Sequence, residues 1–181
     1  MDSRRYIEQL NRQDDIKAQF RAVGHLAEDL QDWPVMIALC RTACETDNER
    51  LRKLILGVLQ GQAVVANQLF AHWALNNRLP TMRASALMNL SLMRCTTARG
   101  VVMQGLHDPD LLVRLAAGLN VGLYEDAEAQ LAFDRFLQRH RSALRTADLR
   151  RGLAEIRRWV WNWFFAKHRR RHFKVRLRHA S

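Results

Sequence analysis

The chain has few residues that interrupt helices or cross-link them. Its 181 residues include three prolines, eight glycines and three cysteines. No stretch alternates polar and apolar residues between turn signals, so the sequence predicts no β-sheet. Scarce proline and glycine, with abundant leucine, alanine, arginine and glutamine, favour helix throughout. With 48% hydrophobic residues, the chain can bury the core of a domain.

Its cysteines and apolar runs also limit the class of protein. The cysteine count is odd, and residues 1–6 lack the apolar run of a secretory signal. We therefore expect free thiols and a cytoplasmic location. The longest apolar-rich run, residues 159–166, is far shorter than the roughly 18 residues that span a bilayer. The sequence therefore predicts a soluble protein.

Motifs that carry chemistry are missing as well. The sequence has no Gly-rich phosphate loop, no GxSxG elbow and no HExxH motif. Cys40 and Cys44 are four residues apart, which suits two metal-bound thiolates, but no pair of His or Cys follows at ligand spacing. We therefore expect buried thiols, no metal, no cofactor and no enzymatic activity.

What the chain does have is a 31-residue period. An arginine preceded by an apolar residue recurs at this spacing, at Arg21, Arg52, Arg83, Arg114 and Arg145. Two apolar columns share the period: Leu39, Phe70, Val101, Ala132 and Trp163, and Cys40, Ala71, Val102, Phe133 and Phe164. Such a period predicts stacked helical hairpins. We interpret the arginines as an internal ladder to carboxylates or carbonyls of neighbouring turns, rather than as a row that binds phosphates.

The period also predicts the boundaries of the helices. Residues 1–14 form a lead-in, and residues 15–166 form the repeat domain. The hairpins are expected at 15–30 with 33–45, 48–60 with 63–76, 79–95 with a second helix to about 106, 108–125 with 127–140, and 142–154 with 156–167. Asp32 is expected to cap the helix that contains Pro34, and Asp108 to open the fourth hairpin.

One stretch points to a family. Residues 108–119, with the sequence DPDLLVRLAAGL, resemble the first helix of a HEAT repeat, in which an Asp opens the helix and a Val-Arg pair follows. The resemblance implies a right-handed α-solenoid of about five 31-residue helical hairpins. It also implies that the second helices line the concave surface. Large aromatic and arginine side chains at those positions are candidate partner-binding residues: Trp73, Arg99, Arg135, Arg158, Trp161 and Phe165. The alternatives are that Trp73 packs against a bulky neighbour, and that the tail covers Trp161 and Phe165.

All of the excess positive charge lies at the C-terminal end. Residues 139–181 hold 14 Lys and Arg against Asp148 and Glu155, a charge of +12, whereas the preceding residues carry −1. This asymmetry is typical of an attached interaction segment. We expect residues 167–181 to be a basic tail that contacts nucleic acid or another polyanion. Its candidate residues are Lys167, Arg169, Arg170, Arg171, Lys174, Arg176 and Arg178. An anionic membrane surface, an acidic protein and a merely solvated tail are the alternatives.

These observations predict a non-catalytic scaffold or adaptor in a larger assembly, with a protein partner on the concave face and a polyanion on the tail. One alternative is a solenoid that binds nucleic acid directly. This includes the HEAT-like DNA glycosylases, which use an Asp, a Trp and an Arg; here Asp134, Trp73 and Arg135 supply those types. The other alternative is an adaptor at the membrane surface.

The aromatic candidates at the C-terminal end allow a first test. Replacing Trp161 and Phe165 together by alanine should weaken capture of a protein partner, because aromatic side chains anchor interfaces. The melting temperature should stay nearly unchanged, as measured by circular dichroism, and co-purified proteins should be compared by mass spectrometry. A large fall in melting temperature would place the two side chains in the core instead.

Overall fold

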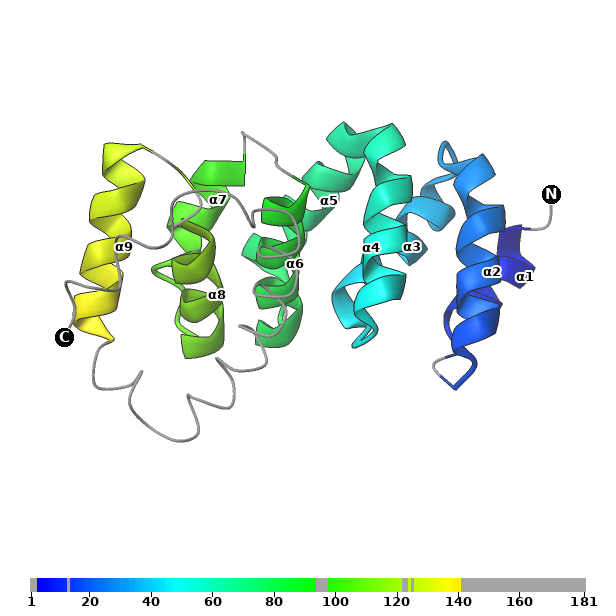
Figure 1. Ribbon diagram of the computed structural model, residues 1–181, viewed down its shortest axis with the longest axis horizontal. Helices are drawn as coiled ribbons and strands as arrows, with labels where there is room; N and C mark the ends of the chain where they lie inside the picture. Colours follow the sequence, from blue (N-terminus) through cyan, green and yellow to red (C-terminus); the bar gives the residue numbers. More distant parts are fainter. Residues whose placement is uncertain (1–2, 13, 94–97, 122–123, 125, 141–181) are drawn as a thin grey trace, which may run out of the picture. The chain divides into compact units, whose positions relative to one another are not determined.

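The computed structural model describes residues 3–12, 14–93, 98–121, 124 and 126–140. The chain divides into two compact units, residues 1–140 and 141–181, and every described residue belongs to the first. All regular structure in this described part is helical (Figure 1), which confirms the all-α prediction. The expected fifth hairpin and Arg145 lie outside the described residues.

The described part contains nine α-helices and two 3-10 turns. The helices are α1 (Ser3–Leu10), α2 (Ile16–Leu26), α3 (Trp33–Glu45), α4 (Glu49–Leu59), α5 (Ala63–Asn76), α6 (Pro80–Leu92), α7 (Ala98–Gly105), α8 (Leu111–Val121) and α9 (Ala127–Arg139). The 3-10 turns are η1 (Ala27–Asp29) and η2 (Gln60–Gln62). The bounds of α3 and α5 equal those expected from the sequence.

Short polar side chains start several of these helices. The carboxylates of Asp15 and Asp126 accept hydrogen bonds from the amides of Ala18 and Ala129, at 2.9 and 2.8 Å. Such bonds satisfy amides that have no partner within the helix. Asp32 is different, because it occupies the N-cap position of α3 without a side-chain cap bond. Pro34 follows in the first turn and removes one of the amides that the cap would use.

Neighbouring helices pack both in sequence and one element apart. Helix α5 packs against α6 and α7, and α6 packs against α8 (Figure 1). In the same way α1 packs against α2 and α3, and α2 packs against α4. The core therefore lies between successive helix pairs. Of the two predicted apolar columns, Leu39, Phe70, Cys40 and Val102 are buried, whereas Val101, Ala71, Ala132 and Phe133 are half-buried.

One stretch has the length and composition of a membrane-spanning helix. Residues Glu49–Asn76 include an 18-residue window with a mean hydropathy of 1.4. This stretch is not a single straight element, because η2 separates α4 from α5 and the backbone at Gln62 leaves the helical region at φ −131° and ψ 41°. Both halves contribute to the core described above, through Leu51, Ile55 and Phe70 among others. Core packing accounts for part of their apolar composition, since 33% of the window is buried and Val64 is 72% exposed.

Two glycines allow neighbouring helices to approach closely. A Cβ atom at Gly105 of α7 would lie 2.9 Å from both the Cβ of Ala117 and the Cδ1 of Leu87. A Cβ atom at Gly118 of α8 would overlap the ring of Phe136, a buried residue of α9. The contact between α8 and α9 therefore depends on the missing side chain at Gly118.

Gly118→Ala should lower the free energy of unfolding by about 1–3 kcal/mol, because the added methyl group overpacks this contact. Gly24 of α2 provides the matched control, since a Cβ atom there meets nothing within 4 Å. Gly24→Ala should raise the stability by up to about 1 kcal/mol through its better helix propensity. Urea unfolding followed by circular dichroism compares the two variants. Equal effects would show that Phe136 moves aside without cost.

Candidate functional site

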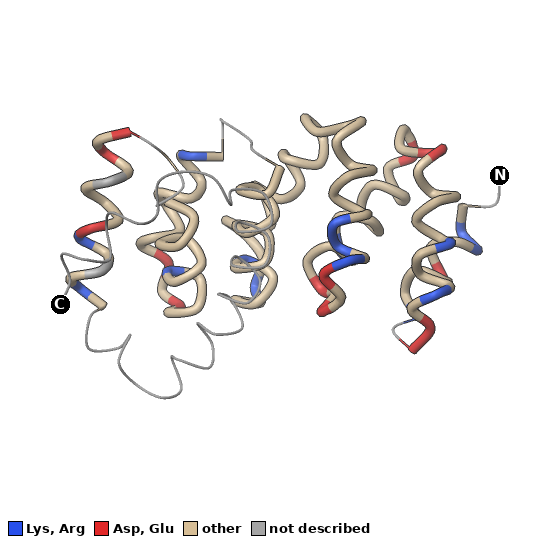
Figure 2. The backbone as a smooth tube through the Cα atoms, in the orientation of Figure 1, with Lys and Arg blue, Asp and Glu red and all other residues tan. Residues whose placement is uncertain are grey.

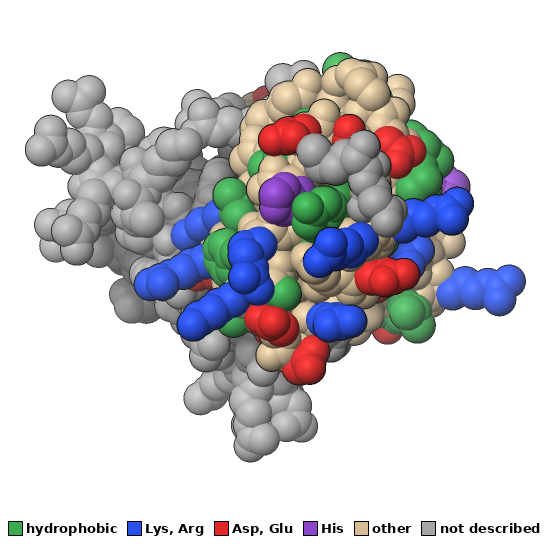
Figure 3. Space-filling view, turned by 90° about the vertical axis from the view of Figure 1, so that its right-hand side faces the viewer, with side chains coloured by type: hydrophobic (Ala, Val, Ile, Leu, Met, Phe, Trp, Pro, Cys, Tyr) green, Lys and Arg blue, Asp and Glu red, His purple; other side chains and the backbone are tan. Residues whose placement is uncertain are grey.

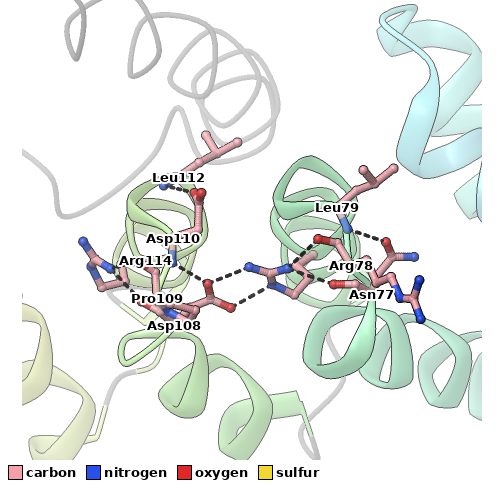
Figure 4. Close-up of polar contacts among 9 residues, drawn as sticks. Asn77, Arg78, Leu79, Asp108, Pro109, Asp110, Leu112 and Arg114 are labelled. Atoms are coloured by element: carbon pink, nitrogen blue, oxygen red, sulfur yellow. Dashed lines mark hydrogen bonds and ion pairs between the residues drawn. The ribbon is translucent and has the colours of Figure 1, made fainter.

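The arginine column repeats one contact to the main chain. Arg52, Arg83 and Arg114 each donate to the carbonyl six residues upstream, on Thr46, Asn77 and Asp108 respectively. For Arg83 and Arg114 the Nη1 to oxygen distances are 2.8 and 2.6 Å (Figure 4). These carbonyls belong to the loop that enters each arginine's own helix. The arginines therefore hold loops to helices, as the ladder interpretation predicted; Arg21 is exposed.

Arg83 also reaches the next loop. Its Nε and Nη2 atoms donate to the two carboxylate oxygens of Asp108, each at 2.9 Å (Figure 4). The side chains of Arg83 and Asp108 are only 11% and 12% exposed. Burial by itself raises the pKa of Asp108. The hydrogen bonds from Arg83 and from the Asp110 amide, with the charges of Arg83 and Arg114, outweigh burial and leave this pKa below its ordinary value.

Among the described repeats, only Arg83 has a carboxylate at this spacing. The position 25 residues after Arg83 is Asp108, whereas the corresponding positions after Arg21, Arg52 and Arg114 are Thr46, Asn77 and Arg139. Asp108 is thus committed to Arg83 and to the amide of Asp110. The amide of Leu112 in the first turn of α8 is bonded instead by Asp110, at 2.8 Å. The sequence assigned the opening of this hairpin to Asp108.

Arg52 and the nearby cysteines lie in the core. Arg52 is 3% exposed and donates from Nε to the carbonyl of Ala43 at 3.0 Å. Burial lowers the pKa of Arg52 to about 10. Burial also raises the pKa of Cys44 to about 12 and raises that of Cys40, where the neighbouring Cys44 adds to the effect. Both thiols are therefore protonated and unreactive at neutral pH. No group of three or more His, Cys, Asp or Glu in the described ranges is arranged to hold a metal.

The structure places three of the six predicted partner-binding residues. Trp73 of α5 is half-buried, with its ring edge-on to Phe70 at a centroid distance of 6.4 Å. This contact agrees with the alternative that Trp73 packs against a bulky neighbour. Arg135 is exposed on α9, beside the exposed Asp134. Arg158, Trp161 and Phe165 lie outside the described residues, as do all of the tail residues from Lys167 to Arg178.

The third residue, Arg99 of α7, is already paired. Its Nη2 atom contacts Asp126 at 2.9 Å and Glu128 at 2.6 Å, and its Nε donates to Asp126 at 3.0 Å. The hydrogen bond from Arg99 is the main reason that the pKa of Asp126 falls to about 2. Arg99 therefore ties α7 to the start of α9. Its charge is neutralised within the chain, which weakens its candidacy as a partner-binding residue.

Close to this pair, a cleft of about 200 Å³ lies between α7 and α9. Its lining contains five apolar residues and five charged or histidine side chains. The apolar residues are Met103, Leu106, Leu131, Ala132 and Phe136, and the others are His107, Glu128, Arg135, Arg139 and His140. We call this feature the α7–α9 cleft. The sequence singled out Arg135 alone of these residues as a candidate.

Leu131 shows what the sequence missed. The 31-residue register aligns Leu131 with Ala38 and Leu69, which are both 8% exposed, and with Gly100, which is exposed. The side chain of Leu131 is 49% exposed and lines the cleft. The register is therefore ambiguous at this position, and a leucine by itself does not indicate an exposed site.

A second cleft, of about 350 Å³, lies where α1 and α2 meet the end of α3. Its lining is mainly polar, with Gln19, Thr42, Glu45 and Asp47 among its residues. Gln19 is 5% exposed and donates to the carbonyl of Leu10 at 2.8 Å, so its amide group serves the fold.

Of the protein-family models and curated proteins compared with this chain, none matches. The resemblance to HEAT repeats therefore stays a prediction that rests on residues 108–119 and on the 31-residue register.

The Arg83 contacts lead to a stability prediction. Arg83→Met should lower the free energy of unfolding by about 1.5–3 kcal/mol, because it removes charge-assisted bonds to the scarcely exposed Asp108. Arg99→Met, which breaks a pair whose partners are 44% and 71% exposed, should have a much smaller effect. Urea unfolding at neutral pH measures both. Equal effects would mean that the Arg83 bridge contributes no more than a surface pair.

The same bridge predicts a dependence on pH. Because the folded-state pKa of Asp108 is lowered, its ionised form stabilises the fold above the ordinary carboxylate pKa of about 4. This contribution is lost as the pH falls through the lowered value. The stability difference between wild type and Asp108→Asn should therefore be largest at neutral pH and shrink in acid. A constant difference across a pH series of unfolding curves would contradict the assignment.

Proposed function

We propose that this chain is a non-catalytic adaptor built as a HEAT-like, right-handed α-solenoid of about five hairpins. Two observations support this architecture. The arginine-to-carbonyl contact recurs at the 31-residue spacing in three successive hairpins, and helices one element apart pack together. An array of this kind presents long surfaces to partners. The protein partner occupies the face that carries α7 and α9, and the protein acts in the cytoplasm.

The observation that carries the proposal is that most arginines of the central helices are bonded within the chain. In the described part, Arg52, Arg83 and Arg114 bond to main-chain carbonyls, and Arg99 is neutralised by two carboxylates. Helix α5 has no charged residue, and α6, α7 and α8 have one arginine each (Figure 2). These helices therefore lack a row of free cations that would follow a phosphate backbone. Contact with a polyanion falls to residues 139–181, whose charge is +12.

The α1–α2 end of the described unit provides a control surface for the binding experiment. Arg4, Arg5, Arg12 and Lys17 are exposed on or beside α1 and α2. Figure 3 views this end, where acidic side chains are interspersed among the basic ones. Mixed charges of this kind give a weaker field than a run of one sign. Binding of nucleic acid can therefore be compared between two variants, each of which loses four positive charges, one set in the tail and one on or beside α1 and α2.

Replacing Arg169, Arg170, Arg171 and Lys174 by glutamine in the full chain should abolish most binding to a duplex DNA or RNA probe. Neutralising Arg4, Arg5, Arg12 and Lys17 in the same way should leave binding nearly unchanged. Fluorescence anisotropy at two salt concentrations gives the affinities and their salt dependence. The slope of log affinity against log salt should fall by up to about 4 in the tail variant, because each lost phosphate contact removes about one unit.

Other results would revise the proposal in defined ways. Strong binding of DNA by the tail variant would favour direct recognition by the solenoid itself. Binding to anionic vesicles but to neither nucleic acid would favour an adaptor at the membrane surface. If the wild type binds none of the three probes in a salt-dependent manner, the tail has no polyanion function. Excision of a methylated base by the purified protein would overturn the non-catalytic assignment.

A further inference from the structure

The α7–α9 cleft combines apolar residues with two arginines that form no salt bridge with a described carboxylate. Leu131 is 49% exposed at its edge, and Phe136 lies within it as a buried residue of α9. A volume of about 200 Å³ is below the roughly 300–1,000 Å³ of typical small-molecule sites. It has room for one large side chain rather than for a cofactor. The cleft is therefore suited to an apolar anchor residue of a peptide.

The charges around the cleft are predominantly positive. Arg135 and Arg139 lie on α9 at positions that also line the cleft, and no described carboxylate forms a salt bridge with either. Glu128 is the one carboxylate in the lining, and it is bonded to Arg99 at 2.6 Å. Burial, together with the charges of Arg114 and Arg139, lowers the pKa of His140. These features favour an anionic occupant.

The chain's own C-terminal segment does not suit this cleft. Residues 141–181 carry 13 Lys and Arg against two acidic residues, a charge of +11, so like charges on Arg135 and Arg139 oppose their insertion. The described unit also lacks an acidic, apolar segment free to occupy it. A nucleic acid would satisfy the charge, but its phosphates gain nothing from the exposed Leu131. A protein segment with both acidic and large apolar side chains matches both parts of the lining.

We propose that the α7–α9 cleft is the docking site for an acidic amphipathic helix of a partner protein. Leu131 and Phe136 receive an apolar anchor of that helix, and Arg135 and Arg139 pair with its carboxylates. Helix-in-groove recognition of this kind uses anchors spaced at helical intervals. The inference rests on the proposed adaptor function and gives it a located site and a partner chemistry.

The test uses the full chain and a labelled synthetic helix of about 18 residues, built from leucine at helical spacing with glutamate and alanine between. Leu131→Glu and Arg135→Glu should each weaken its binding at least about tenfold by fluorescence anisotropy. Leu75→Glu and Arg21→Glu are matched controls, because Leu75 is 44% exposed and Arg21 is exposed, and neither lines the cleft. They should leave the affinity unchanged. A peptide with lysine in place of glutamate should not bind.

The basic tail could attract an acidic peptide by itself, so the tail-neutralised protein is tested in parallel. The proposal expects its affinity to equal that of the wild type. If the peptide affinity falls in the tail variant but is unchanged by Leu131→Glu and Arg135→Glu, the cleft is not the binding site. The titration with DNA and RNA tests the adaptor function independently of this result. Failure of the wild type to bind the peptide overturns the proposal. A large fall in melting temperature for Leu131→Glu also overturns it, because the chain itself would then cover the cleft.

Discussion

Bonds from a helix arginine to the carbonyl six residues upstream organise the described part of this chain. A carbonyl in a loop between helices lacks the partner that a regular helix would provide, and leaving it buried without one costs free energy. Arg52, Arg83 and Arg114 meet this need in three successive hairpins. Each bond fixes the angle at which the chain enters its helix, and hence the face that the helix presents to its neighbours. The main role of these arginine side chains is therefore to stabilise the fold.

The scarcity of acidic residues explains why the ladder is uneven. No Asp or Glu occurs between Glu49 and Asp108, so the central hairpins cannot neutralise their arginines locally. Arg83 reaches forward to Asp108, and Arg99 reaches forward to Asp126 and Glu128. Both pairs join an arginine in the stretch without acidic residues to an acidic residue further along the chain. The order of charges along the chain thus determines which hairpins are bonded to each other.

The sequence predicted the helices well and the site poorly, for physical reasons. Local signals such as Asp15, Asn48 and Pro80 begin α2, α4 and α6 within about one residue of the expected positions, and the periodic pattern placed α3 and α5 correctly. Asp108 could cap α8 or bond to Arg83. Which of these roles it takes depends on Arg83, 25 residues away in sequence, so the residues around Asp108 alone could not predict it. Exposure depends on distant neighbours as well, so that Leu131 is 49% exposed although Leu69, one of its register partners, is buried. Trp73 and Arg99 were predicted as binding residues because of their residue types. In the structure they contact other residues of the chain, Phe70 and Glu128 among them.

The turn at Gln60–Gln62 has a consequence for the apolar stretch that it interrupts. By length and composition this stretch resembles a membrane-spanning helix. Two glutamines and a glycine then lie at its middle, where hydrocarbon would leave their amide groups without hydrogen-bond partners. The polar groups that separate α4 from α5 would therefore carry a cost in a bilayer that they do not carry in water.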